Sequence, residues 1–501
     1  MAGDGALLGF DVGSSSIKAA LIDARSGAVT ASATSPRQEL AIRADRPGWA
    51  EQDPAVWWEN LVAAAAEVRV TSGKAWAGVR AIGVTYQMHG LVLLDKAGQV
   101  LRPSIIWCDS RAVDIGEKAF RGLGGAACLP RLLNSPGNFT ASKLAWVKEN
   151  EPAVFSRAAQ FLLPGDWIAL RLTGEARTTV SGLSECVLWD YPRNARADEV
   201  LDWFGIPHGL VPKPSAAFSP QGGLTAEAAS ALGLPKGTPL CYRAGDQPNN
   251  AFSLGVLDPG QAAATAGTSG VVYGITDTPT VDAASRVNTF VHVNHEAARP
   301  RYGVLLCVSG TGILYSWLRR LLVGDSGAVG YDEMNRVAAG APVGSDGLRV
   351  LPFGNGAERT LENANPGASV LGLDFNRHGI PHLLRGAQEG IVFALRYGLA
   401  IMKDMGLDIR TVRAGRSNMF LSPLFREAFA TTTGTRVELF ETDGAQGAAR
   451  GAGVGAGVYP SIKDAFVGLR AAHAEEPDPG KARAYQDAYG SWEEALRKSL
   501  R

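Results

Sequence analysis

The chain has 501 residues, which is too long for one ordinary hydrophobic core, so we expect at least two domains. Lys and Arg together number 49, as do Asp and Glu, so the net charge is zero. No overall field would attract nucleic acid or an anionic membrane, and we expect neither as a partner. No apolar run could span a bilayer, no signal-peptide pattern precedes the first predicted strand, and the 5 cysteines form no CxxC pair. These features predict a cytoplasmic protein.

The first predicted element is a β-hairpin with strands over residues 7–12 and 17–22 and a turn of Gly-Ser-Ser-Ser. Small residues let backbone N–H groups approach a phosphate closely, and hydroxyl groups add donors. The candidate phosphate ligands of this turn are Gly13, Ser14 and Ser15.

Two charged residues flank the same turn. A carboxylate beside a phosphate is repulsive unless a cation lies between them, so Asp11 points to Mg²⁺. Lys18 either adds positive charge to the site or is an ordinary solvated lysine of the return strand. The Walker A pattern GxxxxGK[ST] is absent, which excludes a P-loop enzyme.

Strands and helices alternate from the hairpin to about residue 240, which is the pattern of an α/β domain. A helix is predicted over residues 59–69 and a buried strand over residues 79–85. The loop after this strand carries Gln87 and His89, which suit the many polar groups of a polyol, although a single histidine is more often structural.

The next polar loop runs from Trp107 to Arg111 and contains Asp109. An aspartate and an arginine there could bind a sugar, and an ion pair within the loop is the plainer alternative.

Asp246 follows a predicted apolar strand over residues 240–244. A carboxylate at the end of such a strand could take a proton from a substrate hydroxyl and orient the oxygen toward a phosphate. An N-cap for the helix that follows is an equally good interpretation, and the two roles are compatible.

A second α/β half begins near residue 258 with another glycine and hydroxyl turn, formed by Gly267, Thr268 and Ser269. Helices are predicted over residues 312–322 and 382–405, and a charged helical segment begins near residue 477. The glycines of residues 451–456 nominally fit a dinucleotide motif, but they follow no strand, so we expect close helix packing there.

Several motifs together, in order over nearly the whole chain, resemble the FGGY family of carbohydrate kinases within the actin-like ATPase superfamily. The motifs are Gly9-Phe10-Asp11-Val12-Gly13, Gly48-Trp49-Ala50-Glu51-Gln52-Asp53-Pro54, Gln87-Met88-His89-Gly90, Trp107-Cys108-Asp109-Ser110-Arg111, Phe139-Thr140-Ala141-Ser142-Lys143-Leu144, Gly245-Asp246-Gln247 and Gly267-Thr268-Ser269-Gly270. The Gln-Met-His-Gly segment is similar to that of family members that act on xylulose.

The resemblance implies an α/β fold with two ribonuclease-H-like domains flanking a deep cleft. ATP and Mg²⁺ would be the cofactors, and the reaction would be phosphorylation of D-xylulose at O5. The expected domains are an N-terminal FGGY domain over 1–252, a C-terminal FGGY domain over 253–460 and a helical tail over 461–501. A homodimer is expected by analogy only.

The resemblance also assigns residues to roles. Asp246 would be the general base, and Asp11 and Asp246 would hold the metal. The expected substrate-binding residues are Gln87, Met88, His89, Asp109, Asp246 and Gln247. The expected ATP-binding residues are Gly13, Ser14, Ser15, Lys18, Gly267, Thr268, Ser269, Gly310, Thr311, Gly415 and Asn418.

Three positions depart from the family pattern. Gln247 stands where xylulose-specific members often have Asn, and Arg416 interrupts the usual run of glycines after Gly415. The usual Asn or Asp after Gly174-Glu175 is replaced by the stretch Ser181-Gly182-Leu183-Ser184-Glu185. Ribulose, gluconate and glycerol therefore remain alternative substrates, and a non-catalytic sensor or a polymerising ATPase on the same fold are more distant alternatives.

Overall fold

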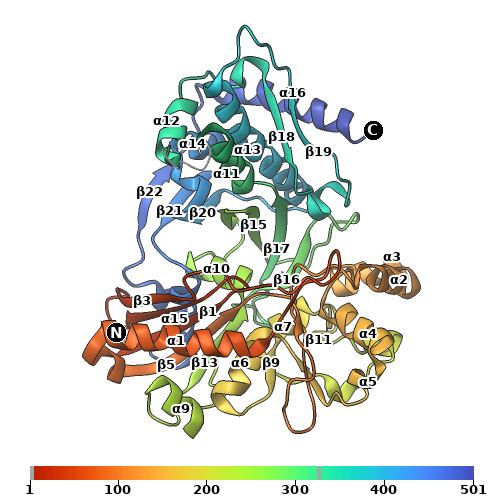
Figure 1. Cartoon of the computed structure of the whole chain (residues 1–501), viewed down its shortest axis with the longest axis vertical. Helices are drawn as coiled ribbons and strands as arrows, with labels where there is room; N and C mark the ends of the chain where they lie inside the picture. Colours follow the sequence, from red (N-terminus) through yellow and green to blue (C-terminus); the bar gives the residue numbers. More distant parts are fainter. Residues whose placement is uncertain (1–4, 324–328) are drawn as a thin grey trace. The chain divides into compact units, whose positions relative to one another are not determined.

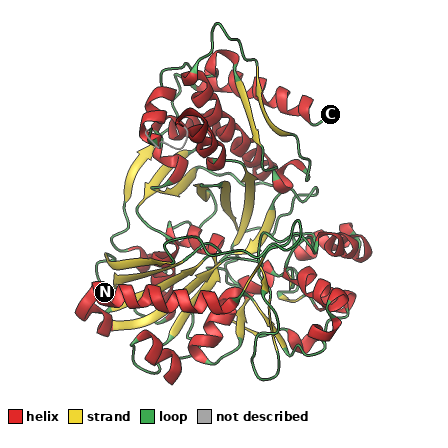
Figure 2. Cartoon of the chain, in the orientation of Figure 1, coloured by secondary structure: helices red, strands yellow, loops and turns green. Residues whose placement is uncertain are grey.

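A computed structural model describes residues 5–323 and 329–501, which divide into two compact units. The first unit comprises Met1–Gly255, Phe290–Tyr302 and Thr442–Leu469, and the second comprises Val256–Thr289, Gly303–Glu441 and Arg470–Arg501. Helices and strands mix in both units (Figure 2), so the predicted α/β class is confirmed. None of the helices described is both long and apolar enough to cross a membrane.

The first unit is built on a five-stranded sheet of order β13-β5-β1-β2-β3. Strand β2 runs antiparallel to β1 and β3, whereas β5 runs parallel to β1 and to β13. The predicted first hairpin is thus present as β1 and β2. The strands are β1 (Ala6–Val12), β2 (Ile17–Asp23), β3 (Val29–Ser35), β5 (Val79–Tyr86) and β13 (Leu240–Gly245).

Helix α1 (Pro54–Ser72) packs against β2 and β3 and crosses the front of the sheet in Figure 1. It begins where the sequence provides a cap, because the side chain of Asp53 accepts a hydrogen bond of 2.9 Å from the backbone N of Ala55. A proline follows at the first helical position, where its missing N–H costs nothing.

Helix α15 (Gly444–Gly455) packs against β1, β5 and β13, although it begins almost 200 residues after the end of the last of them. Its backbone almost touches the sheet. A Cβ added to Gly9 would lie 1.9 Å from the carbonyl O of Ala445, and one added to Gly83 would lie 2.0 Å from that of Ala448. Gly9 and Gly83 are partners in the β1–β5 register, so two neighbouring positions of the sheet carry no side chain where the helix packs. The predicted close packing of the glycines at 451–456 is confirmed: a Cβ on Gly451 would lie 2.5 Å from the ring of Tyr242.

The remaining strands and helices of the first unit are shorter than α1. The short strands are β4 (Glu51–Gln52), β6 (Val92–Leu94), β7 (Ser104–Ile105), β8 (Gln160–Leu162), β9 (Arg177–Thr179), β10 (Trp189–Asp190), β11 (Ala195–Arg196) and β12 (Lys213–Ser215). The helices are α2 (Val113–Leu123), α3 (Gly125–Leu132), α4 (Thr140–Asn150), α5 (Pro152–Phe155), α6 (Pro164–Thr173), α7 (Val180–Glu185), α8 (Asp198–Phe204), α9 (Ala226–Leu232) and α10 (Asp246–Ser253).

The second unit repeats the same strand order in the core of its sheet, β16-β17-β15-β14-β20-β21-β22. In both units a hairpin supplies the central strand and its antiparallel neighbour, and two later parallel strands extend the other side. The strands of this sheet and of the second unit are β14 (Gln261–Ala266), β15 (Ser269–Thr276), β16 (Asn288–Val291), β17 (Tyr302–Ser309), β18 (Arg349–Phe353), β19 (Gly367–Leu371), β20 (Thr411–Gly415), β21 (Arg436–Phe440) and β22 (Ala471–Glu475). The last two residues of β16 and the first of β17 are counted in the first unit. The helices of the second unit are α11 (Gly312–Val323), α12 (Tyr331–Ala338), α13 (Ile380–Asp404), α14 (Pro423–Thr433) and α16 (Ala482–Ser499).

The C-terminal segment differs from the expected helical tail in one respect. Helix α16 is present, but β22 precedes it and pairs with β21 at the edge of the sheet. Four of the five side chains of β22 are exposed, so the sequence carries no alternation of polar and apolar residues that would have predicted a strand.

Candidate active site

The turn between β1 and β2 is tight and braced by neighbouring side chains. The backbone N of Gly13 donates to the carbonyl O of Ser16 over 3.1 Å. Gln52 donates from Nε2 to the carbonyl O of Ser14 over 2.7 Å, and Trp107 donates from Nε1 to its Oγ over 3.2 Å. Ser15 is exposed. The turn is therefore held in place while part of it remains open to a ligand.

Asp11 lies at the end of β1, opposite Lys18 in the hairpin register. The pKa of its carboxyl is raised to about 6, first by burial and then by the charge of Asp443, while Lys18 opposes the shift. Lys18 is shared, because its Nζ lies 3.3 Å from Oδ2 of Asp443. The first residue of α15, Gly444, leaves the room for Asp11: a Cβ there would collide with Oδ2 of Asp11.

Asp443 is a site residue that the sequence analysis did not identify. It lies 432 residues after Asp11, outside every motif, and it caps α15 by accepting a hydrogen bond of 2.9 Å from Gln446 N. The Asp-Gly pair before an alanine-rich helix predicts such a cap, but nothing in the sequence places it beside β1.

Asp246 is the first residue of α10, directly after β13, and Gly245 holds the N-cap position. The pKa of Asp246 is raised to about 7 by burial and by the charge of Asp11, whereas hydrogen bonds with Gln247 oppose the shift. Asp11 and Asp246 are therefore close enough to repel each other. A carboxylate that titrates near neutral pH beside a second carboxylate is suited to accepting a proton or to sharing a cation.

The loop after β5 lies against the start of α10. Gln87 is buried and donates from Nε2 to Oε1 of Gln52 over 3.4 Å, which connects it to the glycine and serine turn. Met88 is buried as well, and Gly245 makes room for it, because a Cβ on Gly245 would lie 2.5 Å from its Cγ. His89 is partly exposed and has a φ of 60°, an uncommon conformation for a residue other than glycine.

Glu185, at the end of α7, is a second site residue that the sequence analysis did not identify. Its Oε1 accepts a hydrogen bond of 3.3 Å from His89 N, and its carbonyl O lies 2.9 Å from Nδ1 of His89. Burial holds the pKa of Glu185 well above its usual range, and the charges of Asp166 and Asp246 add to this. The sequence showed only that this stretch departs from the family pattern; the structure places a carboxyl group there.

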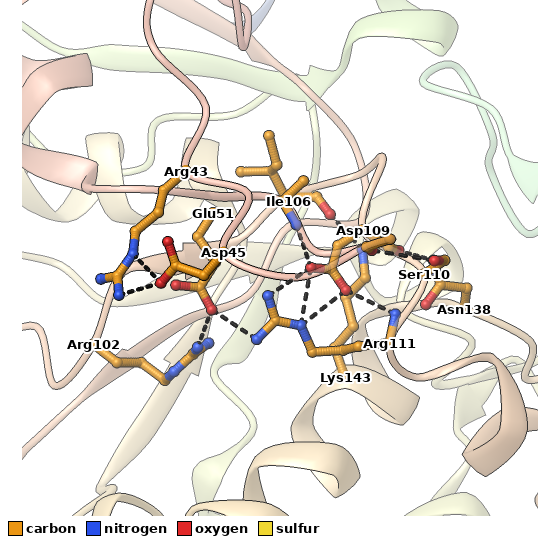
Figure 3. A network of polar contacts seen from close by, with 12 residues as sticks. Arg43, Asp45, Glu51, Arg102, Ile106, Asp109, Ser110, Arg111, Asn138 and Lys143 are labelled. Carbon is orange, nitrogen blue, oxygen red and sulfur yellow. Dashed lines mark hydrogen bonds and ion pairs between the residues drawn. The ribbon is translucent and has the colours of Figure 1, made fainter.

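Asp109 is fully buried in a network of charged side chains (Figure 3). The side chain of Arg111 donates to both carboxylate oxygens, from Nε to Oδ1 over 3.0 Å and from Nη2 to Oδ2 over 2.6 Å. The backbone N of Ala50 also donates to Oδ2, over 2.6 Å. The ion pair within the loop is thus present, and a contact between Asp109 and substrate stays a prediction.

In the second unit, the turn between β14 and β15 is assembled with two later segments. The carbonyl O of Gly267 accepts hydrogen bonds from Gly312 N over 2.7 Å and from Oγ1 of Thr311 over 2.8 Å. A Cβ on Gly267 would lie 3.4 Å from Nδ2 of Asn418, so this turn and the turn after β20 are neighbours. Thr268 and Asn418 are exposed.

The structure therefore brings the predicted nucleotide residues of the second unit together at one end of its sheet. Gly310 has a φ of 101°, and Gly415 ends β20 beside the turn that carries Asn418. Their role in binding ATP stays a prediction, as does that of Ser269.

Comparison with known proteins defines the class of protein. Residues 6–253 match the N-terminal domain of the FGGY family of carbohydrate kinases, and residues 262–458 match its C-terminal domain. The chain belongs to the FGGY family of carbohydrate kinases, enzymes that transfer a phosphoryl group from ATP to a carbohydrate. The resemblance noted in the sequence is confirmed.

Particular relatives can also be named. The chain is 30% identical over 450 residues to the xylulose kinase of Klebsiella pneumoniae, covering 89% of this chain and 88% of the relative. It is 29% identical to the L-xylulose/3-keto-L-gulonate kinase of Escherichia coli (strain K12), covering 98% and 96%. The crystal structure of xylulose kinase from Rhodospirillum rubrum superposes with a TM-score of 0.88 at 29% identity over 98% of both chains. The predicted fold class of two ribonuclease-H-like α/β domains is confirmed by these matches and by the repeated strand order.

Proposed function

We propose that the protein transfers the γ-phosphoryl group of ATP to O5 of D-xylulose, producing D-xylulose 5-phosphate and ADP. Relatives and a solved structure described as xylulose kinases support the choice of sugar. The observation that carries the proposal is the position of Asp246, which begins α10 beside the Gln87–His89 loop and has a pKa raised to about 7.

Asp246 is proposed as the general base. Its carboxylate takes the proton from the O5 hydroxyl while that oxygen forms a bond to the γ-phosphorus, and the bond from this phosphorus to the β,γ-bridging oxygen breaks. The bridging oxygen leaves with ADP, and the proton remains on Asp246 until it is released to water. Gln87, Met88, His89 and Gln247 would bind the sugar in the orientation that brings O5 to Asp246.

The residues present fit a magnesium ion. The negative charge of Asp11 raises the pKa of Asp246, and the charge of Asp443 raises that of Asp11, so three carboxyl groups lie close together. A divalent cation would relieve this repulsion with the oxygen ligands that it prefers. When bound, Mg²⁺ would neutralise charge on the transferred phosphoryl group. We assign Gly13–Ser15, with Lys18, and Gly267–Ser269 to phosphate binding through their N–H and hydroxyl donors.

The same chemistry on another sugar is the main alternative. The L-xylulose/3-keto-L-gulonate kinase is 29% identical to this chain, and Glu185 stands where the family pattern differs. A coupled ADP-release assay with Mg-ATP across D-xylulose, L-xylulose, ribulose, gluconate and glycerol tests the proposal. Fastest turnover on D-xylulose supports the proposal. Faster turnover on another sugar identifies that sugar as the substrate instead, and the absence of ADP release with every one of them rejects the proposed kinase function.

The pH dependence of turnover should follow Asp246. Its carboxyl loses its proton as the pH rises through about 7, and only the unprotonated form can accept a proton from the sugar. We therefore expect kcat/KM for the sugar to fall about tenfold for each pH unit below this value. A kcat/KM that stays constant between pH 5 and 8 would contradict the assignment.

Replacement of His89 should weaken sugar binding selectively. Asparagine is the suitable replacement, because it tolerates the positive φ of this position better than alanine does. We expect His89→Asn to raise the KM for the sugar about tenfold or more through lost contacts, with the KM for ATP unchanged. Steady-state kinetics with each substrate varied in turn measures this. An equal rise in both KM values would indicate a general loss of structure instead.

A further inference from the structure

Lys143, in α4, is a fully buried lysine outside the roles assigned so far. Its Nζ donates a hydrogen bond of 3.0 Å to the carbonyl O of His89 and one of 2.8 Å to the carbonyl O of Ile106. An ammonium group is costly to bury unless its donors are used, so this lysine is held where it is by the two carbonyl groups.

These two carbonyl groups belong to the two loops that carry the predicted sugar-binding residues. His89 ends the loop after β5, and Ile106 follows β7 and begins the loop that contains Asp109. The loops are already neighbours, because Leu91 N donates to Ile105 O over 2.9 Å. Lys143 therefore links the two loops close to the points where they leave their strands.

His89 needs such support. Its φ of 60° is costly for a residue with a side chain and persists only where the surroundings determine it. Glu185 accepts from the backbone N of His89, and Lys143 donates to its carbonyl O, so the peptide groups on both sides of the strained residue are held. The ring also packs on Phe139, with a centroid distance of 4.8 Å.

The groups around Lys143 determine over which pH range its side chain carries a positive charge. Asp109 is negative, but Arg111 already forms an ion pair with it and opposes the charge on Lys143. Cys108 and Cys186 also face the lysine, and burial raises the pKa of both thiols above their ordinary value, so they remain neutral at pH 8. Burial lowers the pKa of Lys143 to about 8, with Asp109 acting in the opposite direction.

We propose that the charged side chain of Lys143 is a positioning residue that holds the His89 and Ile106 loops in the conformation that binds the sugar. This inference rests on the proposed binding of sugar at His89. The lysine touches no reacting atom in this role, so its loss should act on sugar affinity far more than on ATP affinity.

The test compares Lys143→Met with Lys148→Met. Methionine keeps most of the length and removes the donors. Lys148 is a matched control, because it lies in the same helix and also donates to two carbonyl groups, those of Phe204 and Gly205, over 2.6 and 2.8 Å. We expect Lys143→Met to raise the KM for the sugar about tenfold or more while the KM for ATP stays within about twofold, and Lys148→Met to change neither.

The wild-type pH profile is a second test that does not depend on the folding of a variant. A lysine with a lowered pKa is charged below that value, so the KM for the sugar should rise as the pH passes about 8. In Lys143→Met the KM should be high and independent of pH over the same range.

Two results would overturn the inference: a sugar KM within about twofold of wild type in folded Lys143→Met, or a wild-type sugar KM that stays flat between pH 7 and 9.5. A failure of the proposed function looks different, because the wild-type protein would then phosphorylate none of the sugars, and the inference would fall with it.

Discussion

Asp246→Asn is expected to reduce kcat by about a thousandfold or more while leaving ATP binding unchanged. The amide keeps the size and position of the side chain at the start of α10 but cannot accept the proton of the O5 hydroxyl. Single-turnover kinetics with D-xylulose and titration of the nucleotide measure the two quantities separately. Turnover within about tenfold of wild type would reject Asp246 as the base.

Stability distinguishes this loss of chemistry from a loss of structure. The pKa of Asp246 is raised from 3.8 to about 7 in the folded protein, so the folded state holds the proton more tightly than the unfolded chain does. The stabilisation of the folded state by protonated Asp246 is complete below pH 4 and is lost as the pH rises through 7. At pH 8 the wild type therefore carries a buried charge that Asp246→Asn lacks, and we expect the variant to melt at the same temperature or higher.

Gly9→Ala is expected to have the largest effect on folding. The added methyl group would lie 1.9 Å from Ala445 O and 2.5 Å from Ala449 N, and both of these atoms are backbone of α15, which cannot rotate away. The helix would have to move off the sheet, which should cost about 3 kcal/mol or more. Urea denaturation followed by circular dichroism measures the free energy of unfolding.

Gly209→Ala is the matched control, because Gly209 is an exposed glycine of the same unit with nothing within 4 Å of an added Cβ and no positive φ. It should leave stability within about 0.5 kcal/mol of wild type. Gly83→Ala should behave like Gly9→Ala, since its methyl group would collide with Ala448 O. Equal stability of Gly9→Ala and Gly209→Ala would contradict the close approach of α15 to the sheet.

The motif around Gly9 shows how far the sequence could be interpreted. Gly9 belongs to a segment that predicted a phosphate turn, and the turn at Gly13–Ser15 has the expected hairpin geometry. Gly9 itself has a different role: it lets α15 approach β1. The sequence shows that a glycine is present, but the reason for it lies in a helix more than 400 residues further along the chain.

The buried ionisable groups show more clearly that the sequence reveals which residues are present but not what they contact. Lys143 lies in a recognised motif and Glu185 in a departure from one, yet neither had a role in the sequence analysis. Their importance comes from what they touch, the carbonyl O and the backbone N of His89. Asp443 has no motif at all and reaches Asp11 only because α15 returns to the first sheet.

The sequence by itself determined the family, the α/β class, the two glycine and hydroxyl hairpins and the placement of Asp11 and Asp246 at strand ends. Such features can be predicted because hairpin turns, strand patterns and helix starts depend on residues close together in the chain. Only the tertiary structure decided which segments complete each unit, which charges surround Asp11 and Asp246, and how His89 is held. Burial and charge proximity set these properties, and both depend on contacts between residues that are distant in the sequence.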